Sequence, residues 1–182
     1  MQLVGNNKKQ KIVTSAVSGT LILVIYSMIF SFSEQDGEQT GELSMYFSEK
    51  CIRLLNMLIG NRWTEAFVQE LANYFDSPLR KLAHFAEYAV LGALIYILLR
   101  QWLAKGRKLY LLVTLWVFVS AVADELHQFF VPGRWSSPAD VLLDTIGAIC
   151  AIILLVLLEN HTPRRTKREK ASIRRVGKDK KN

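Results

Sequence analysis

LYLLVTLWVFVSAVADELHQFF, residues 109–130, is an almost continuous apolar run that ends in a polar patch containing two adjacent carboxylates, Asp124 and Glu125. A helix of about 20 mostly apolar residues is long enough to cross a bilayer. Ionisable side chains inside such a span are costly, so they usually face the interior of a helix bundle or a wet cavity. The run therefore predicts a membrane-spanning helix with polar partners on its neighbours.

Three further segments are apolar and long enough to cross a membrane. The first could pass for a signal peptide, but its apolar part is long and no small-residue cleavage site stands out after it. Ser77–Pro78 and Ser137–Pro138 each place a hydroxyl before a proline, which is typical of a helix start. The sequence therefore predicts an all-α, multi-pass transmembrane helical bundle with spans at about 12–30, 79–99, 109–130 and 138–158.

Basic residues are concentrated on one side of these predicted spans. They precede the first span, fill the loop between the second and third, and follow the fourth, where residues 160–182 hold ten Lys/Arg and two Asp/Glu. Because basic residues favour the cytoplasmic side, we expect a cytoplasmic N-terminus (1–11), a membrane domain (12–159) and a basic cytoplasmic tail (160–182). Such a tail fits anionic membrane lipid better than nucleic acid, or it serves only to set the topology.

Residues 31–77 are then predicted to form an extracellular loop. Within it, FSEKCIRLLNMLIG (47–60) and RWTEAFVQELANYF (62–75) carry apolar residues at helical spacing. They predict one or two amphipathic helices on the outer surface. A packed extracellular cap is an equally good interpretation.

Polar residues of the last three spans are predicted to lie at one depth. Glu87, Asp124 and Asp144 each lie about six residues from the outer end of their span, which is about 9 Å along a helix. Spacings of three and four residues place other polar groups on the same helical faces. We expect an outward-open pocket whose further members are Lys81, His84, Glu125, Gln128, Arg134 and Asp140.

Several of these residues also have purely structural interpretations. Lys81 could extend to the lipid headgroups, and Asp140 could stabilise the start of the fourth span. His127 is expected to face outward, away from the pocket. Gly92 and Gly147 are expected to permit close packing of helices.

The polar pattern resembles the VanZ-like family of bacterial membrane proteins. KLAHFAEYAVLG (81–92) and DELHQFFVPGRWSSPADVLLDTIGA (124–148) carry this resemblance, which covers roughly residues 78–155. The family often has Asn where Asp144 stands, which leaves the role of Asp144 open. The resemblance implies a protein of the plasma membrane of Gram-positive-type bacteria, linked to low-level resistance to teicoplanin-type glycopeptides.

Three functions are compatible with the pocket. In the first, the protein recognises or modifies a lipid-linked or cell-wall component, or a glycopeptide-related ligand. Lys81, His84 and Arg134 would then hold a phosphate, and Glu87, Asp124 or Glu125 would serve as general acid or base. The second is a small proton- or ion-coupled transporter or its accessory. The third is a structural protein whose polar network only fixes helix packing.

Metal and cofactor chemistry is poorly supported by the sequence. Zinc prefers Cys or several His ligands, whereas this cluster has one well-placed His. The carboxylates Asp124, Glu125, Asp140 and Asp144 would suit Mg²⁺ or Ca²⁺ better, but the signal is weak, and we predict no metal site. The chain contains no GxSxG, HExxH or glycine-rich phosphate loop, and the pattern identifies neither a cofactor nor an oligomeric state.

Overall fold

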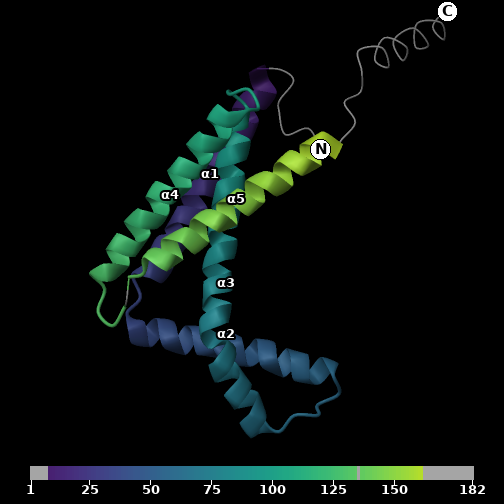
Figure 1. Cartoon of the computed structure of the whole chain (residues 1–182), viewed down its shortest axis with the longest axis vertical. Helices are drawn as coiled ribbons and strands as arrows, with labels where there is room; N and C mark the ends of the chain where they lie inside the picture. Colours follow the sequence, from purple (N-terminus) through teal and green to yellow (C-terminus); the bar gives the residue numbers. More distant parts are fainter. Residues whose placement is uncertain (1–7, 135, 162–182) are drawn as a thin grey trace, which may run out of the picture.

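The computed structural model describes residues 8–134 and 136–161. Within these residues the chain is helical and contains no strand. The helices, shown in Figure 1, are α1 (Lys8–Ser33), α2 (Gly37–Leu58), α3 (Glu65–Arg100), α4 (Arg107–Phe129) and α5 (Pro138–His161). Most of the predicted basic tail and residues 1–7 lie outside the described residues, so the predictions for them stay predictions.

Four of the helices, α1, α3, α4 and α5, are long and apolar enough to cross a membrane. The predicted all-α bundle with four spans is therefore confirmed. Each span exposes large apolar side chains, among them Leu23, Leu82, Leu115 and Leu154. Such side chains suit contact with lipid tails, which are equally apolar.

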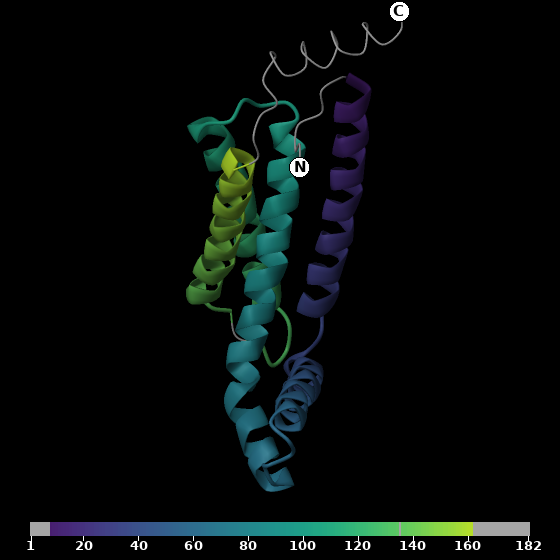
Figure 2. The same cartoon turned by 90° about the vertical axis from the view of Figure 1, so that its right-hand side faces the viewer.

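Helix α3 is central to the bundle, because it packs against each of the other helices (Figure 2). Its closest approach is to α5. A Cβ added to Gly92 would lie 2.6 Å from the Cβ of Ala148, and one added to Gly147 would lie 2.5 Å from the carbonyl oxygen of Phe85. The prediction that these two glycines permit close helix packing is thus confirmed.

The prediction that a helix starts at Ser77–Pro78 is wrong. Helix α3 begins directly after Thr64, whose hydroxyl accepts a hydrogen bond from the amide of Phe67, and it continues through Pro78. An interior proline removes one helical hydrogen bond. The first part of α3 nevertheless stays helical because Val68 and Ala72 are fully buried there, in a small core beneath α2.

The Ser137–Pro138 signal, by contrast, does mark a helix start. Helix α5 begins at Pro138, and the hydroxyl of Ser137 accepts a hydrogen bond from the amide of Ala139 at 3.2 Å. The two similar dipeptides therefore differ in outcome. Only the second follows a tight turn, whereas the first follows a segment that packs as a helix.

Helix α2 crosses α3 at one end of the bundle (Figure 1), which we call the α2 end. It buries Ser48, Ile52 and Asn56, and exposes apolar side chains such as Phe47 and Leu58 elsewhere on its surface. The hydroxyls of Ser44 and Ser48 donate to Asp76 of α3. The predicted amphipathic helices between the first two spans are therefore α2 and the first part of α3.

Candidate functional site

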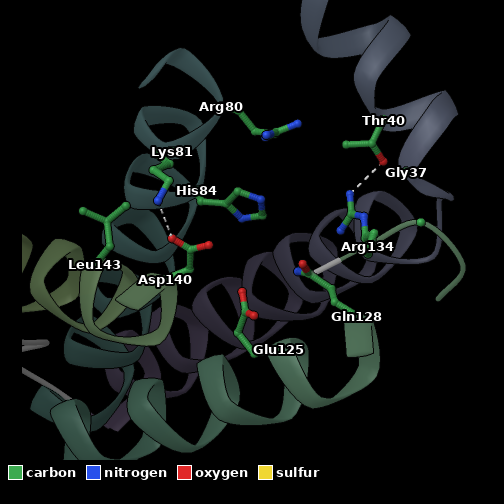
Figure 3. A pocket seen from close by; sticks show the side chains of 11 residues that line it. Gly37, Thr40, Arg80, Lys81, His84, Glu125, Gln128, Arg134, Asp140 and Leu143 are labelled. Carbon is green, nitrogen blue, oxygen red and sulfur yellow. Dashed lines mark hydrogen bonds and ion pairs between the residues drawn. The ribbon is translucent and has the colours of Figure 1, made fainter. Parts of the chain in front are cut away.

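A cavity of about 180 Å³ lies at the α2 end of the bundle, between α3, α4, the start of α5 and the turn that precedes α5 (Figure 3). We call it the polar cavity. Most of the residues that the sequence pattern assigns to a pocket line it, namely Lys81, His84, Glu125, Gln128, Arg134 and Asp140. Glu87, Asp124 and Asp144 do not line it.

The turn that carries Arg134 is held against the start of α2. The amide of Gly37 donates to the carbonyl oxygen of Pro132 at 3.1 Å. The approach is so close that a Cβ on Gly37 would overlap the carbonyl of Gly133, which itself adopts a φ of 73°. A positive φ of this size favours glycine. These glycines fix where the Arg134 side chain enters the cavity.

Among the described residues, Arg134 donates hydrogen bonds to neutral acceptors. Its Nη2 donates to the carbonyl oxygen of Phe32 at 3.0 Å and to the hydroxyl of Thr40 at 2.8 Å. Burial lowers the pKa of Arg134 from its ordinary value, but a guanidinium group stays charged at neutral pH. The end of α1 and the start of α2 are therefore tied to a cation at the cavity wall.

Lys81 and Asp140 form an ion pair across the cavity. The distance from Lys81 Nζ to Asp140 Oδ1 is 3.0 Å, and the pair connects α3 to the first turn of α5. Asp140 lies in the first turn of α5, as its structural interpretation expects, and Lys81 pairs with it. Because the two charges neutralise each other, the pair adds little net charge to the cavity.

The two adjacent carboxylates of α4 face different partners. Glu125 is buried and accepts a hydrogen bond from the backbone amide of Ser137 at 2.8 Å, so it holds the start of α5. Asp124 accepts from the hydroxyl of Ser33 at 2.5 Å and from Gln128 Nε2 at 2.9 Å. Asp124 therefore bonds to neutral groups of α1 and α4, where the sequence led us to expect Lys81, His84 and Arg134.

Glu87 lies at a second cavity, of about 320 Å³, between α2, α3 and the end of α1. We call this the apolar groove because its walls are mainly apolar side chains, including Phe32, Leu43, Phe47 and Leu79. One carboxylate oxygen of Glu87 lies 3.9 Å from His84 Nδ1. Glu87 is therefore beside the polar cavity, with its neighbour His84 lining both spaces.

Asp144 is buried between helices and lines neither cavity. Only 2% of the residue is exposed, and its Oδ1 has no hydrogen-bond partner among the described residues. A lone buried polar atom is costly in a bundle. Asp144 therefore lies in the packed interior of the bundle, one turn of α5 further along the chain than Asp140, which lines the polar cavity.

Arg80 is the cavity residue that the sequence analysis missed. It lines both cavities, and it makes no hydrogen bond or ion pair with the residues that the structure describes. Figure 3 shows its side chain extending from α3 toward the side where Arg134 and Thr40 lie. The signal was present, because Arg80 and His84 are four residues apart and share a helical face.

His127 lines neither cavity, as expected, but it is half-buried rather than fully turned outward. Its ring stacks on Phe30 of α1 with the ring centroids 4.9 Å apart, and its Nε2 is buried. The reason is that the end of α1 packs along α4. A single span considered alone cannot reveal which of its faces the first helix covers.

The balance of charge makes the polar cavity suited to an anion. Lys81 is paired with Asp140, and Glu125 is bonded to a backbone amide, so the guanidinium groups of Arg80 and Arg134 keep no direct carboxylate partner among the described residues. Guanidinium groups bind phosphate and carboxylate strongly, often through two parallel hydrogen bonds. The described residues contain no cluster of three or more His, Cys, Asp or Glu that could hold a metal ion.

One protein family has a sequence model that matches most of this chain. The sequence model of the family described as VanZ/LLP1 matches residues 19–159, which include α2, α3, α4 and most of α1 and α5. The chain matches no curated protein and no solved structure.

Proposed function

We propose that this chain, which belongs to the VanZ/LLP1 family, binds a phosphate-bearing component of the bacterial cell envelope in its polar cavity. Through this binding it contributes to protection against teicoplanin-type glycopeptides. The observation that carries the proposal is the presence of Arg80 and Arg134 at one cavity, without carboxylate partners among the described residues. Arg134 is half-buried and Arg80 is exposed, and guanidinium groups bind phosphate strongly through charge-assisted hydrogen bonds.

The distribution of basic residues supports an outward-facing cavity in the plasma membrane. The end of the bundle opposite α2 holds the start of α1, the connection between α3 and α4, and the end of α5 (Figure 2). Basic residues favour the cytoplasmic side of a membrane, and they are concentrated at this opposite end as Lys8, Lys9, Lys11, Arg100, Lys105, Arg107 and Lys108. We therefore propose that both termini are cytoplasmic and that the cavity opens to the outside.

If the site also catalyses a reaction, Glu87 is the candidate acid or base that we favour. Asp124 and Glu125 already accept hydrogen bonds from the protein. Glu87 lies at the apolar groove, and one of its carboxylate oxygens is 3.9 Å from His84 Nδ1. A proton-transferring side chain must lie within reach of the bound group, and Glu87 is beside His84, which lines both the groove and the polar cavity.

A second candidate, a purely structural network, is favoured by the contacts of Asp124. This carboxylate connects Ser33 of α1 to Gln128 of α4, and Gln128 Nε2 also lies 3.2 Å from the Ser33 hydroxyl. Such a network can fix how helices pack without binding any ligand. It would account for Asp124 but not for Arg80, which contacts no described residue through hydrogen bonds.

Glycopeptide susceptibility of a sensitive Gram-positive host tests the proposal. We expect the wild-type chain to raise the inhibitory concentration of teicoplanin, and Arg80→Gln to abolish this protection at unchanged membrane abundance. Arg53→Gln is the matched control, because Arg53 pairs with Glu49 and Glu65 on the surface, away from the cavity. Full protection by Arg80→Gln would contradict the proposal, and vancomycin tested in parallel measures selectivity.

A further inference from the structure

The apolar groove and the polar cavity are adjoining spaces. Thr40, Arg80, His84 and Arg134 line both. The guanidinium groups therefore lie at the junction between a space lined by charged and polar side chains and a space with mainly apolar walls. A ligand that fills both must be charged at one end and apolar at the other.

The groove has the size and the lining of a ligand site. Its volume is about 320 Å³, and pockets that hold small ligands are typically roughly 300–1,000 Å³ with mostly apolar walls. Leu43 and Phe47 come from α2, and Leu79 and Ala83 come from α3. Glu87 is the one carboxylate among the groove-lining residues that the structure describes.

The groove is also placed where a hydrocarbon chain would be available. Leu79 and Ala83 belong to a helix that is long and apolar enough to cross a membrane. Helix α2, which forms the other wall, exposes Phe47, Leu54 and Leu58. An amphipathic helix with exposed apolar side chains is typical of the boundary between headgroups and acyl chains.

We infer that the apolar groove holds one hydrocarbon chain of an anionic membrane lipid whose phosphate binds Arg80 and Arg134. This inference rests on the proposed function and specifies the chemical class of its ligand. The guanidinium groups at the junction favour a lipid whose headgroup carries a net negative charge. The apolar walls of the groove favour a phosphate that carries a hydrocarbon chain over a free phosphate. The lipid reaches the groove from the bilayer, between α2 and α3.

Native mass spectrometry of the full chain in a nonionic detergent tests this inference. The probes are phosphatidylglycerol, phosphatidylcholine and glycerol phosphate, which separate headgroup charge from the hydrocarbon chain. We expect the wild-type chain to retain phosphatidylglycerol about tenfold better than phosphatidylcholine, since one charge-assisted contact is sufficient for such a ratio. Arg80→Gln should reduce this ratio to about one.

A matched pair of substitutions tests the groove itself. Ala83→Trp fills the groove, whereas Ala86→Trp makes the same change on the same helix at an exposed residue that lines neither cavity. We expect Ala83→Trp to lower retention of phosphatidylglycerol by about tenfold, because displacing a few buried methylene groups has that effect. Ala86→Trp should leave it unchanged.

The outcomes separate a failure of the inference from a failure of the proposed function. If glycerol phosphate binds as well as phosphatidylglycerol, and Arg80→Gln abolishes both, the anion site stands and the groove inference is overturned. If the Arg80→Gln chain retains every probe as well as wild type does, both the proposed anion site and the lipid inference are overturned.

Cys51 provides a second test that alters no residue of the groove. It lines the groove, and the other cysteine of the chain, Cys150, lies on α5. In a Cys150→Ser chain, phosphatidylglycerol should slow the reaction of Cys51 with a soluble maleimide severalfold, while glycerol phosphate should not. An unchanged rate at a lipid concentration that saturates the protein would overturn the inference, whatever the fate of Ala83→Trp.

Discussion

Arg80 and Arg134 are both guanidinium groups at one cavity, but their contacts differ. Arg134 donates to Phe32 and Thr40, so it also holds the turn before α5 against α1 and α2. Arg80 makes no comparable bond among the described residues. Because Arg80 takes no part in the hydrogen bonds among the described residues, it has no evident structural role there. This difference is why Arg80, rather than Arg134, is the residue to substitute when the cavity is tested.

Asp124 shows how a carboxylate in a span can be stabilised by hydrogen bonds from neutral side chains. Replacing it by Ala leaves the Ser33 hydroxyl and the Gln128 amide without their acceptor. Asp124→Ala should therefore lower the free energy of unfolding by about 1–3 kcal/mol, whereas Asp124→Asn, which keeps one acceptor oxygen, should cost less. Thermal unfolding of the purified chain in detergent measures both, and equal stability of Asp124→Ala and wild type would contradict this view of the residue.

At the scale of elements, the crossing of α3 and α5 determines where the polar residues meet. Gly92 and Gly147 allow the two helices to approach closely, and the Lys81–Asp140 ion pair lies nearer the α2 end of the same interface. A wider crossing would separate the two sides of the polar cavity. The glycines therefore contribute to the site by setting the distance between the two helices that carry Lys81 and Asp140.

Substitution of Gly147 tests the importance of this crossing. A Cβ there meets the backbone of Phe85, which cannot rotate away as a flexible side chain would. We expect Gly147→Ala to lower the free energy of unfolding by about 1–3 kcal/mol through overpacking. Gly19→Ala on α1 is the control, because nothing lies within 4 Å of its added Cβ. If both variants unfold alike, close packing at Gly147 is not a source of stability.

The elements also show which features the sequence could predict. Composition and length were sufficient for the four spans, because a bilayer demands long apolar helices. They were insufficient at Pro78, where burial of Val68 and Ala72 outweighs the local signal for a helix start. The Asp124–Ser33 contact joins residues 91 positions apart, and helical spacing carries no information about such partners.

For the molecule as a whole, the central structural feature is the asymmetry of its two ends. One end holds α2 and the two cavities, while the other holds Lys8, Lys9, Lys11, Arg100, Lys105, Arg107 and Lys108. At the basic end, Glu159 of α5 interacts with Arg100 at 3.6 Å and with Lys105 at 3.5 Å. These ion pairs secure the connection between α3 and α4 to the end of α5.

The orientation predicted from this asymmetry can be measured in intact cells. In a Cys150→Ser background, a membrane-impermeant maleimide should label Cys51 on α2 from outside. Lys108→Cys in a chain that also carries Cys51→Ser should react only after lysis, because basic residues near a span favour the cytoplasm. The reverse pattern would place the cavity on the cytoplasmic side and contradict the proposed function in the outer envelope.

The central claim is that the polar cavity binds an anionic phosphate group through Arg80. Phosphorus NMR of glycerol phosphate, added to the purified chain in a nonionic detergent free of phosphate, tests it most directly. We predict that wild type and Arg53→Gln broaden the phosphorus resonance equally, that added salt reverses the broadening, and that Arg80→Gln abolishes it. Equal broadening by Arg80→Gln and wild type, or none by either, would contradict the claim.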